Sequence, residues 1–239
     1  MTNTMPTKAK VMIGAVAATS LFPVSLAIAN WSMPAWPQLA ILMAAAIVTS
    51  RLKVKLPGMA STMSGNLPVI LLAVAQLGLF GSLLVALTAA VAQSFALGNQ
   101  TKPVQFLFNA CTLMNACGIA HFAYHSHFLA GHANGTAVSL TMAAAAYFLA
   151  NTAPVAGIVG LTEGTSPVAL WHRVFLWSFP NYLIGAGLTA LASMFSTAAG
   201  FATLGALMVL SFGVYRSYKM FVDRTEQMAP RALAMAAGR

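Results

Sequence analysis

Residues 64–98 read SGNLPVILLAVAQLGLFGSLLVALTAAVAQSFALG, and the way this stretch is divided decides the fold. As a single helix, a run of 35 residues would measure about 52 Å, against a membrane hydrocarbon core of about 30 Å. Gly78 and Gly81 lie at its middle. Glycine is frequent inside membrane helices, however, and does not by itself mark a break. The placement of charge must therefore decide between one crossing and two.

Charge placement favours two crossings, with short helices at 64–77 and 80–98. The chain then has about eight apolar helices, the others lying at 11–29, 36–50, 103–128, 135–160, 175–196 and 199–218. With the N-terminus in the cytoplasm, all 12 Lys and Arg residues fall on the cytoplasmic side, as the positive-inside rule requires. A single crossing would place Lys102 outside. The first helix of the hairpin spans only about 21 Å, so we expect neighbouring helices to shield it or the bilayer to thin around it.

The composition excludes both a soluble globular enzyme and a disordered chain. Charged residues make up 6% of the 239 residues and apolar residues 59%, against roughly 25% and 45–50% in soluble domains. The net charge of +9 reflects basic cytoplasmic loops facing anionic lipid rather than nucleic acid. The sequence therefore predicts an all-α polytopic membrane bundle, with one transmembrane domain at 1–218, a short cytoplasmic tail at 219–239, and both termini in the cytoplasm.

The N-terminus allows a second interpretation. Lys8 and Lys10, the apolar stretch after them and Ala27-Ile28-Ala29 together resemble a signal peptide with its cleavage site. Cleavage would remove the first helix and leave the other seven in the same orientation.

Polar side chains inside the predicted spans are the candidate functional residues. No Asp or Glu falls within a span, so the usual proton relay of a carrier and the usual ligands of a metallohydrolase are missing, and we expect no enzyme activity. Amides in lipid either hydrogen-bond neighbouring helices or converge on a pocket for a neutral or amphipathic ligand. The candidates for such a pocket are Gln76, Asn109, Asn151 and Asn181.

Two further groups of residues suggest chemistry. His121 and His125 are spaced i, i+4 and share a helix face, which suits a transition metal or haem. They can equally be histidines at the membrane interface or a pH-responsive element, and no cofactor is required. Glu163 and Arg173 flank a short connection and are expected to form an interfacial ion pair.

Short motifs along residues 35–226 resemble the N-terminal membrane-embedded sensor region of bacterial HD-GYP and GGDEF signalling proteins. They are Arg51-Leu52-Lys53-Val54-Lys55-Leu56-Pro57-Gly58 with Ser61-Thr62-Met63-Ser64, Lys102-Pro103-Val104-Gln105 with Phe108-Asn109, Tyr147 through Asn151-Thr152, Leu161-Thr162-Glu163-Gly164, Trp177-Ser178-Phe179-Pro180 and Tyr215-Arg216-Ser217-Tyr218. In that family the last helix continues into a cytoplasmic catalytic domain, whose residues are absent from this sequence.

The resemblance implies a standalone, non-enzymatic sensor-like module of the bacterial inner membrane. Ligand or lipid binding in the bundle would be coupled to a cytoplasmic or membrane partner, with a homo-oligomer as a further possibility and no nucleic-acid partner. Two other classes stay open: a transport module resembling the substrate-binding subunit of a vitamin importer, and an accessory subunit of a membrane complex.

Overall fold

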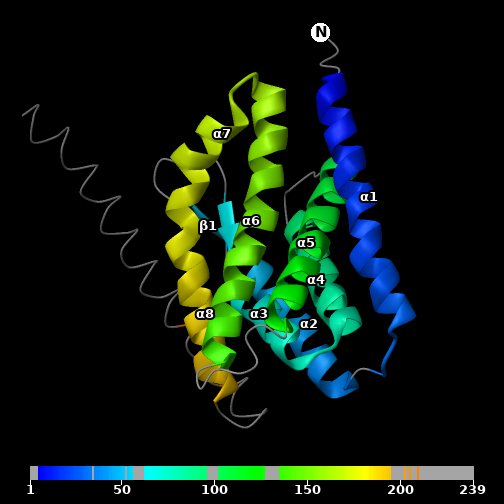
Figure 1. The fold of residues 1–239 in the computed structure, drawn as a ribbon, viewed down its shortest axis with the longest axis vertical. Helices are drawn as coiled ribbons and strands as arrows, with labels where there is room; N and C mark the ends of the chain where they lie inside the picture. Colours follow the sequence, from blue (N-terminus) through cyan, green and yellow to red (C-terminus); the bar gives the residue numbers. More distant parts are fainter. Residues whose placement is uncertain are drawn as a thin grey trace, which may run out of the picture.

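The computed structural model describes residues 5–33, 35–51, 53–55, 62–95, 102–126 and 135–194, with residues 202, 205 and 209 in isolation. These residues form a bundle of α-helices (Figure 1), which confirms the all-α prediction. The bundle helices are α1 (Thr7–Ala29), α2 (Trp36–Arg51), α3 (Leu67–Gln76), α4 (Leu79–Ser94), α5 (Pro103–Tyr124), α6 (Gly135–Glu163) and α8 (Phe179–Ser193), with a four-residue α7 (Pro167–Leu170) before α8.

The predicted break within 64–98 is confirmed. Leu77 and Gly78 adopt extended backbone between α3 and α4. The Ser82 hydroxyl is 3.1 Å from the carbonyl oxygens of both Ala73 and Gly78. Residues nine apart in a continuous helix would be about 13 Å apart along its axis, so the hydroxyl can reach Ala73 only because the chain turns sharply here.

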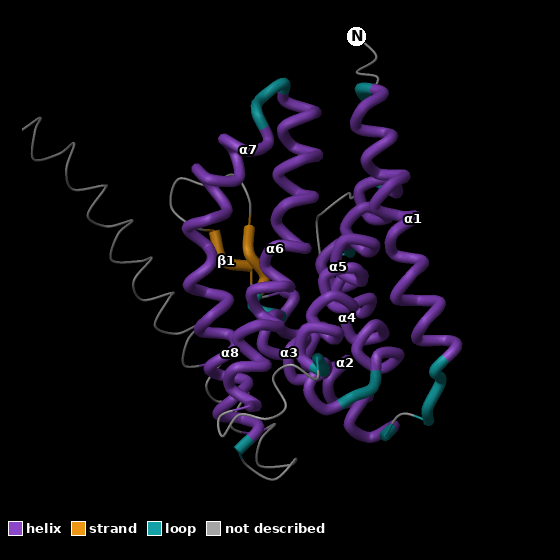
Figure 2. The backbone as a smooth tube through the Cα atoms, in the orientation of Figure 1, coloured by secondary structure: helices purple, strands orange, loops and turns teal. Residues whose placement is uncertain are grey.

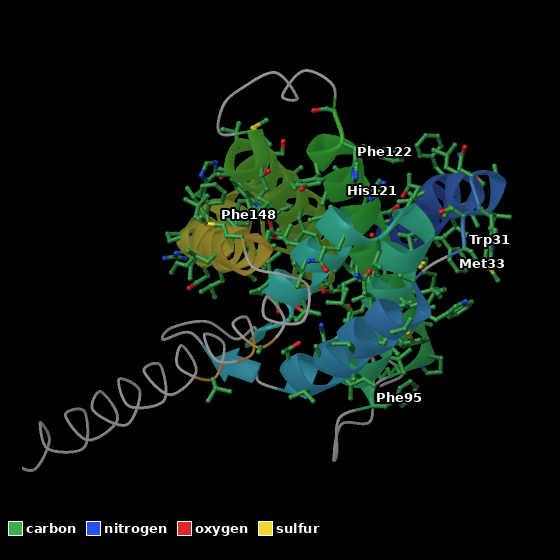
Figure 3. The ribbon with its side chains drawn as sticks, turned by 90° about the horizontal axis from the view of Figure 1, so that it is seen from below. Trp31, Met33, Phe95, His121, Phe122 and Phe148 are labelled. Atoms are coloured by element: carbon green, nitrogen blue, oxygen red, sulfur yellow. The ribbon has the colours of Figure 1, made fainter. Side chains whose placement is uncertain are left out.

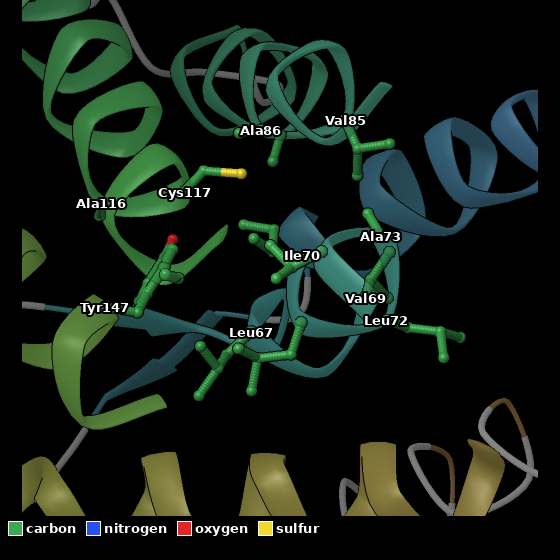
Figure 4. Packing of buried hydrophobic residues seen from close by; sticks show 14 of the residues in the cluster. Leu67, Val69, Ile70, Leu72, Ala73, Val85, Ala86, Ala116, Cys117 and Tyr147 are labelled. Carbon is green, nitrogen blue, oxygen red and sulfur yellow. The ribbon is translucent and has the colours of Figure 1, made fainter. Parts of the chain in front are cut away.

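Helix α3 lies at the centre of the bundle, where its neighbours shield it as predicted. All eight residues from Leu67 to Val74 are buried. Figure 4 shows Leu67, Val69 and Ile70 surrounded by side chains of α4, α5 and α6, and α2 and α8 complete the enclosure. A helix of ten residues measures about 15 Å, too short to cross a bilayer alone, and this burial explains how an apolar helix of that length is accommodated.

Helix α1 runs parallel to α5 along a narrow apolar seam. Ile13 packs against Phe108 and Cys111 near one end of this seam, and Phe22 contacts Phe122 toward the other. Helix α6 runs antiparallel to both, because its Ile158 packs in the same cluster as Ile13. The start of α1, the start of α5 and the end of α6 therefore share one end of the bundle, where Figure 1 also shows α7.

Two segments differ from the sequence-based expectation. The polar 51–63 loop contains a short antiparallel ladder, in which β1 (Lys53–Lys55) pairs with β2 (Thr62–Ser64) (Figure 2). The helical path expected at 175–196 begins earlier, at Pro167, because the Ser166 hydroxyl accepts a hydrogen bond from Ala169 N and a proline suits the first helical turn. The predicted tail at 219–239 lies outside the described residues. So does the predicted helix at 199–218, apart from three isolated positions.

Three helices in the described part of the chain, α1, α5 and α6, are long and apolar enough to cross a membrane. The outward faces of the bundle also carry large apolar side chains. Figure 3 labels Trp31, Met33, Phe95 and Phe122, all of them exposed. A soluble monomer rarely exposes extensive apolar surface, so this surface suits a lipid environment.

Candidate functional site

A cluster of aromatic side chains lies between α6 and the helical path that leads into α8. The ring of Phe148 on α6 (labelled in Figure 3) has its centroid 5.7 Å from that of Trp171 and 5.0 Å from those of both Phe179 and Tyr182. Separations of this size give favourable tilted contacts between aromatic rings. We call these four residues the Phe148 cluster.

Polar groups on α6 hold two members of the Phe148 cluster in place. The Trp171 indole Nε1 donates to the Thr152 hydroxyl at 2.9 Å, and that hydroxyl donates to the Phe148 carbonyl at 2.7 Å. Asn151, the residue before Thr152, donates from Nδ2 to the Tyr182 hydroxyl at 3.2 Å. Each of these groups lies in a largely apolar environment, where losing its partner would cost free energy, so the bonds define one arrangement of α6 against the opposite chain segment.

One side of the Phe148 cluster departs from regular α-helix. Trp171–Phe175 form a π-helical turn (η2), and Leu176–Ser178 form a 3-10 turn (η3) that leads into α8. Pro180 follows directly as the second residue of α8, and its missing N–H removes one α-helical hydrogen bond from this region. On the facing helix, Pro154 lies inside α6 close to Asn151 and Thr152. Single π-helical turns are rare and occur frequently at functional sites.

The chain on either side of the irregular segment is held firmly. Toward α8, Thr189 Oγ1 donates to the Pro68 carbonyl of α3 at 3.2 Å, and Gly185 lies so close to α3 that an added Cβ would be 2.8 Å from Leu67. Toward α7, an added Cβ at Gly160 would be 2.9 Å from Pro167. Residues 171–178 therefore connect two tightly packed points of the bundle.

The structure does not gather the four candidate amides into one pocket. Asn151 belongs to the site just described, whereas Asn181 is exposed and Asn109 is half-buried on α5. Gln76 is the last residue of α3 and lies beside the turn at 77–78, at the end of the bundle that carries Trp31. Its Oε1 atom is buried without a hydrogen-bond partner among the described residues. Asn109 lies about 9 Å along α5 from the start of that helix, and α5 starts at the opposite end of the bundle. Gln76 and Asn109 therefore cannot share a ligand.

The histidine pair is stacked rather than aimed at a common point. The His121 and His125 ring centroids are 4.1 Å apart with an interplanar angle of 33°. The Nδ1 atom of His125 is 3.0 Å from the His121 carbonyl, and the Nδ1 atom of His121 is buried without a partner in the described part of the chain. A metal shared by two imidazoles lies in the plane of both rings, which this stacked pair does not offer. Within the described ranges, no group of three or more His, Cys, Asp or Glu residues could hold a metal ion.

Glu163 and Arg173 both lie at the end of the bundle that carries α7, and both side chains are exposed. Glu163 ends α6, and Gly164 follows with a positive φ of 70°, which turns the chain away toward α7. No ion pair within 4 Å joins the two charges among the residues that the structure describes. Exposed charges gain little from pairing, which explains why the turn can separate them.

In comparisons with known proteins, no family model, no curated protein and no solved structure matches this chain.

Proposed function

We propose that this protein is a multi-pass module of the bacterial inner membrane, without enzyme activity, that couples ligand or lipid binding in its helical bundle to a partner at the cytoplasmic surface. The observation that carries the proposal is the Phe148 cluster, in which a proline-containing helix and a π-helical turn face each other and are joined by specific hydrogen bonds. A segment that contains a π-helical turn and a 3-10 turn can convert to regular helix and so change its packing against α6, which is what a coupling element needs.

The distribution of charge supports the orientation. Lys8 and Lys10 lie at the start of α1, Lys102 directly precedes α5, and Arg173 follows α7, so these exposed cations share one end of the bundle. The opposite end carries the uncharged 30–33 connection with its exposed Trp31. The positive-inside rule then assigns the cationic end, with both termini, to the cytoplasm, where anionic lipid headgroups are the first partners.

The Phe148 cluster lies where a signal could reach that surface. Trp171 begins the π-helical turn, and the exposed His172 and Arg173 follow it directly. A ligand or lipid that displaces the Trp171 indole from Thr152 would change the geometry of the segment that presents those two side chains. The partner that reads this change would be a cytoplasmic or membrane protein or a second copy of the chain, and not nucleic acid.

Purification from membranes in a mild detergent tests the proposal. We expect the chain to retain a stoichiometric protein partner or to run as a dimer, as judged by mass spectrometry and light scattering. Trp171→Phe keeps an aromatic ring but removes the indole N–H that Thr152 accepts, so it should reduce this association several-fold.

The matched control is Trp31→Phe, the same substitution at the opposite end, where Trp31 stacks on Phe80. This control should leave association unchanged. A chain that retains no partner and forms no dimer contradicts the proposal, and so does an equal loss of association in both variants.

A further inference from the structure

The helices that face outward have unequal apolar lengths. After Lys10, helix α1 runs to Ala29 without a further charged residue, a distance of about 29 Å that matches a hydrocarbon core of about 30 Å. Helix α2 runs only from Trp36 to Arg51, about 22 Å. Cations recur directly after α2, because β1 contains Lys53 and Lys55.

The short length of α2 matters because this helix is not enclosed. Leu39, Leu42 and Ala46 are buried against the bundle, whereas Ile41 and Val48 point outward and are 48% and 61% exposed. Two other short helices differ in this respect: α3 is buried along almost all its length, and half of the residues of α4 are buried, with Val91 the one exposed residue of that helix. Helix α2 therefore presents an apolar face that is about 7 Å shorter than that of α1.

We propose that the face of α2 is matched to a locally thinned bilayer, so that the lipid next to it has a hydrocarbon layer of at most about 22 Å while the lipid next to α1 keeps its ordinary thickness. The partner that fits this face is lipid of short effective chain length. Its outer boundary is set by Trp36, and its inner boundary is set by the cations that follow Ser50. The inference rests on the membrane placement proposed above.

Depth measurements with spin labels distinguish the two thicknesses. Val48 lies 12 residues after Trp36, about 18 Å along the axis. In an undeformed layer of about 30 Å, a label at Val48 would lie at least about 12 Å from the inner boundary, whereas next to a thinned layer that ends at the cations it would lie at most about 4 Å from that boundary. Both native cysteines, Cys111 and Cys117, are free and buried, so a nitroxide reagent reaches an introduced cysteine selectively.

Two positions on α1 calibrate the measurement. Val11 and Leu21 are 67% and 65% exposed. A label at Leu21 lies about 12 Å from the outer boundary and one at Val11 about 3 Å from the inner boundary. The experiment attaches a spin label to Val48→Cys, Val11→Cys and Leu21→Cys in vesicles of dioleoylphosphatidylcholine. For each label it measures two collision rates, one with oxygen, which favours the membrane interior, and one with a polar nickel chelate, which favours water. Ile47→Cys gives a second reading on α2.

We expect the Val48 label to lie at a shallow depth, like the Val11 label. When the lipid acyl chains are lengthened from 14 to 22 carbons, the Val48 label should stay shallow and the Leu21 label should become deeper. A Val48 label as deep as the Leu21 label would overturn the thinning alone. Protection of the Val48 label from both reagents would show that protein, not lipid, covers α2. Free access of the nickel chelate to all three labels would overturn the membrane placement itself.

Discussion

Replacing Gly118 by alanine should push α1 away from α5. A Cβ at this position would lie 2.7 Å from Cβ of Pro23, whereas carbon atoms in contact prefer about 3.5–4.0 Å. The ring of Pro23 is rigid and belongs to α1, so a side-chain rotation cannot relieve the overlap and the helix must move by about 1 Å. Overpacking of this kind costs about 1–3 kcal/mol, partly offset by up to about 1 kcal/mol from the better helix propensity of alanine.

Gly14→Ala isolates the packing contribution. Gly14 is also helical, but nothing lies within 4 Å of the position that its Cβ would occupy, so this variant gains the propensity without the overlap. In unfolding titrations from detergent micelles with increasing dodecyl sulfate, followed by circular dichroism, Gly118→Ala should be less stable than Gly14→Ala by about 1–3 kcal/mol. Equal stability of the two variants would refute the close packing of α1 on α5.

Three other substitutions test single hydrogen bonds in the same assay. Asn115→Ala removes both bonds that the amide donates to α1 and should cost about 0.6–1.7 kcal/mol; no loss would mean that the amide does not hold α1. Thr189→Val removes the bond to α3 and should cost about 1 kcal/mol, whereas Thr88→Val, which affects only a bond within α4, should cost less. Ser82→Ala frees the carbonyl groups at the α3–α4 turn and should speed amide hydrogen exchange there, with unchanged exchange as the contrary result.

The overall division of the chain could be predicted because it follows from global constraints. Neither Gly78 nor Gly81 marks the break by itself, but the requirement that Lys102 stay with the other cations admits only two crossings, and the structure places the break at Leu77–Gly78. The start of the path into α8 was wrong by about two turns. Its signal was present in Ser166 and Pro167, a capping residue followed by a proline suited to the first helical turn.

The Phe148 cluster could not be predicted in the same way, because it depends on the register of α6 against a segment about 20–30 residues later. Asn151 was recognised as a candidate, but its bond to Tyr182 requires two helix faces to meet, and helical spacing within one segment does not report on that. Trp171 carries no sequence signal that distinguishes it from an aromatic residue at the membrane interface, and only the structure shows its indole donating to Thr152. The π-helical turn has no sequence signal of its own beyond the nearby Pro180.

Under the proposed function, the anchors on both sides of residues 171–178 restrict the motions that could carry a signal through this region. If α8 moved along its axis, the bond from Thr189 to α3 would have to break and Gly185 would have to slide past Leu67, so a piston motion of α8 is costly. A π-helical turn is wider and shorter than an α-helical turn, and a 3-10 turn is narrower and longer, so joint conversion of η2 and η3 to regular helix nearly preserves the length between the anchors. The change that a partner can read is then a rotation of Trp171, His172 and Arg173 at the cationic end, with α8 left in place.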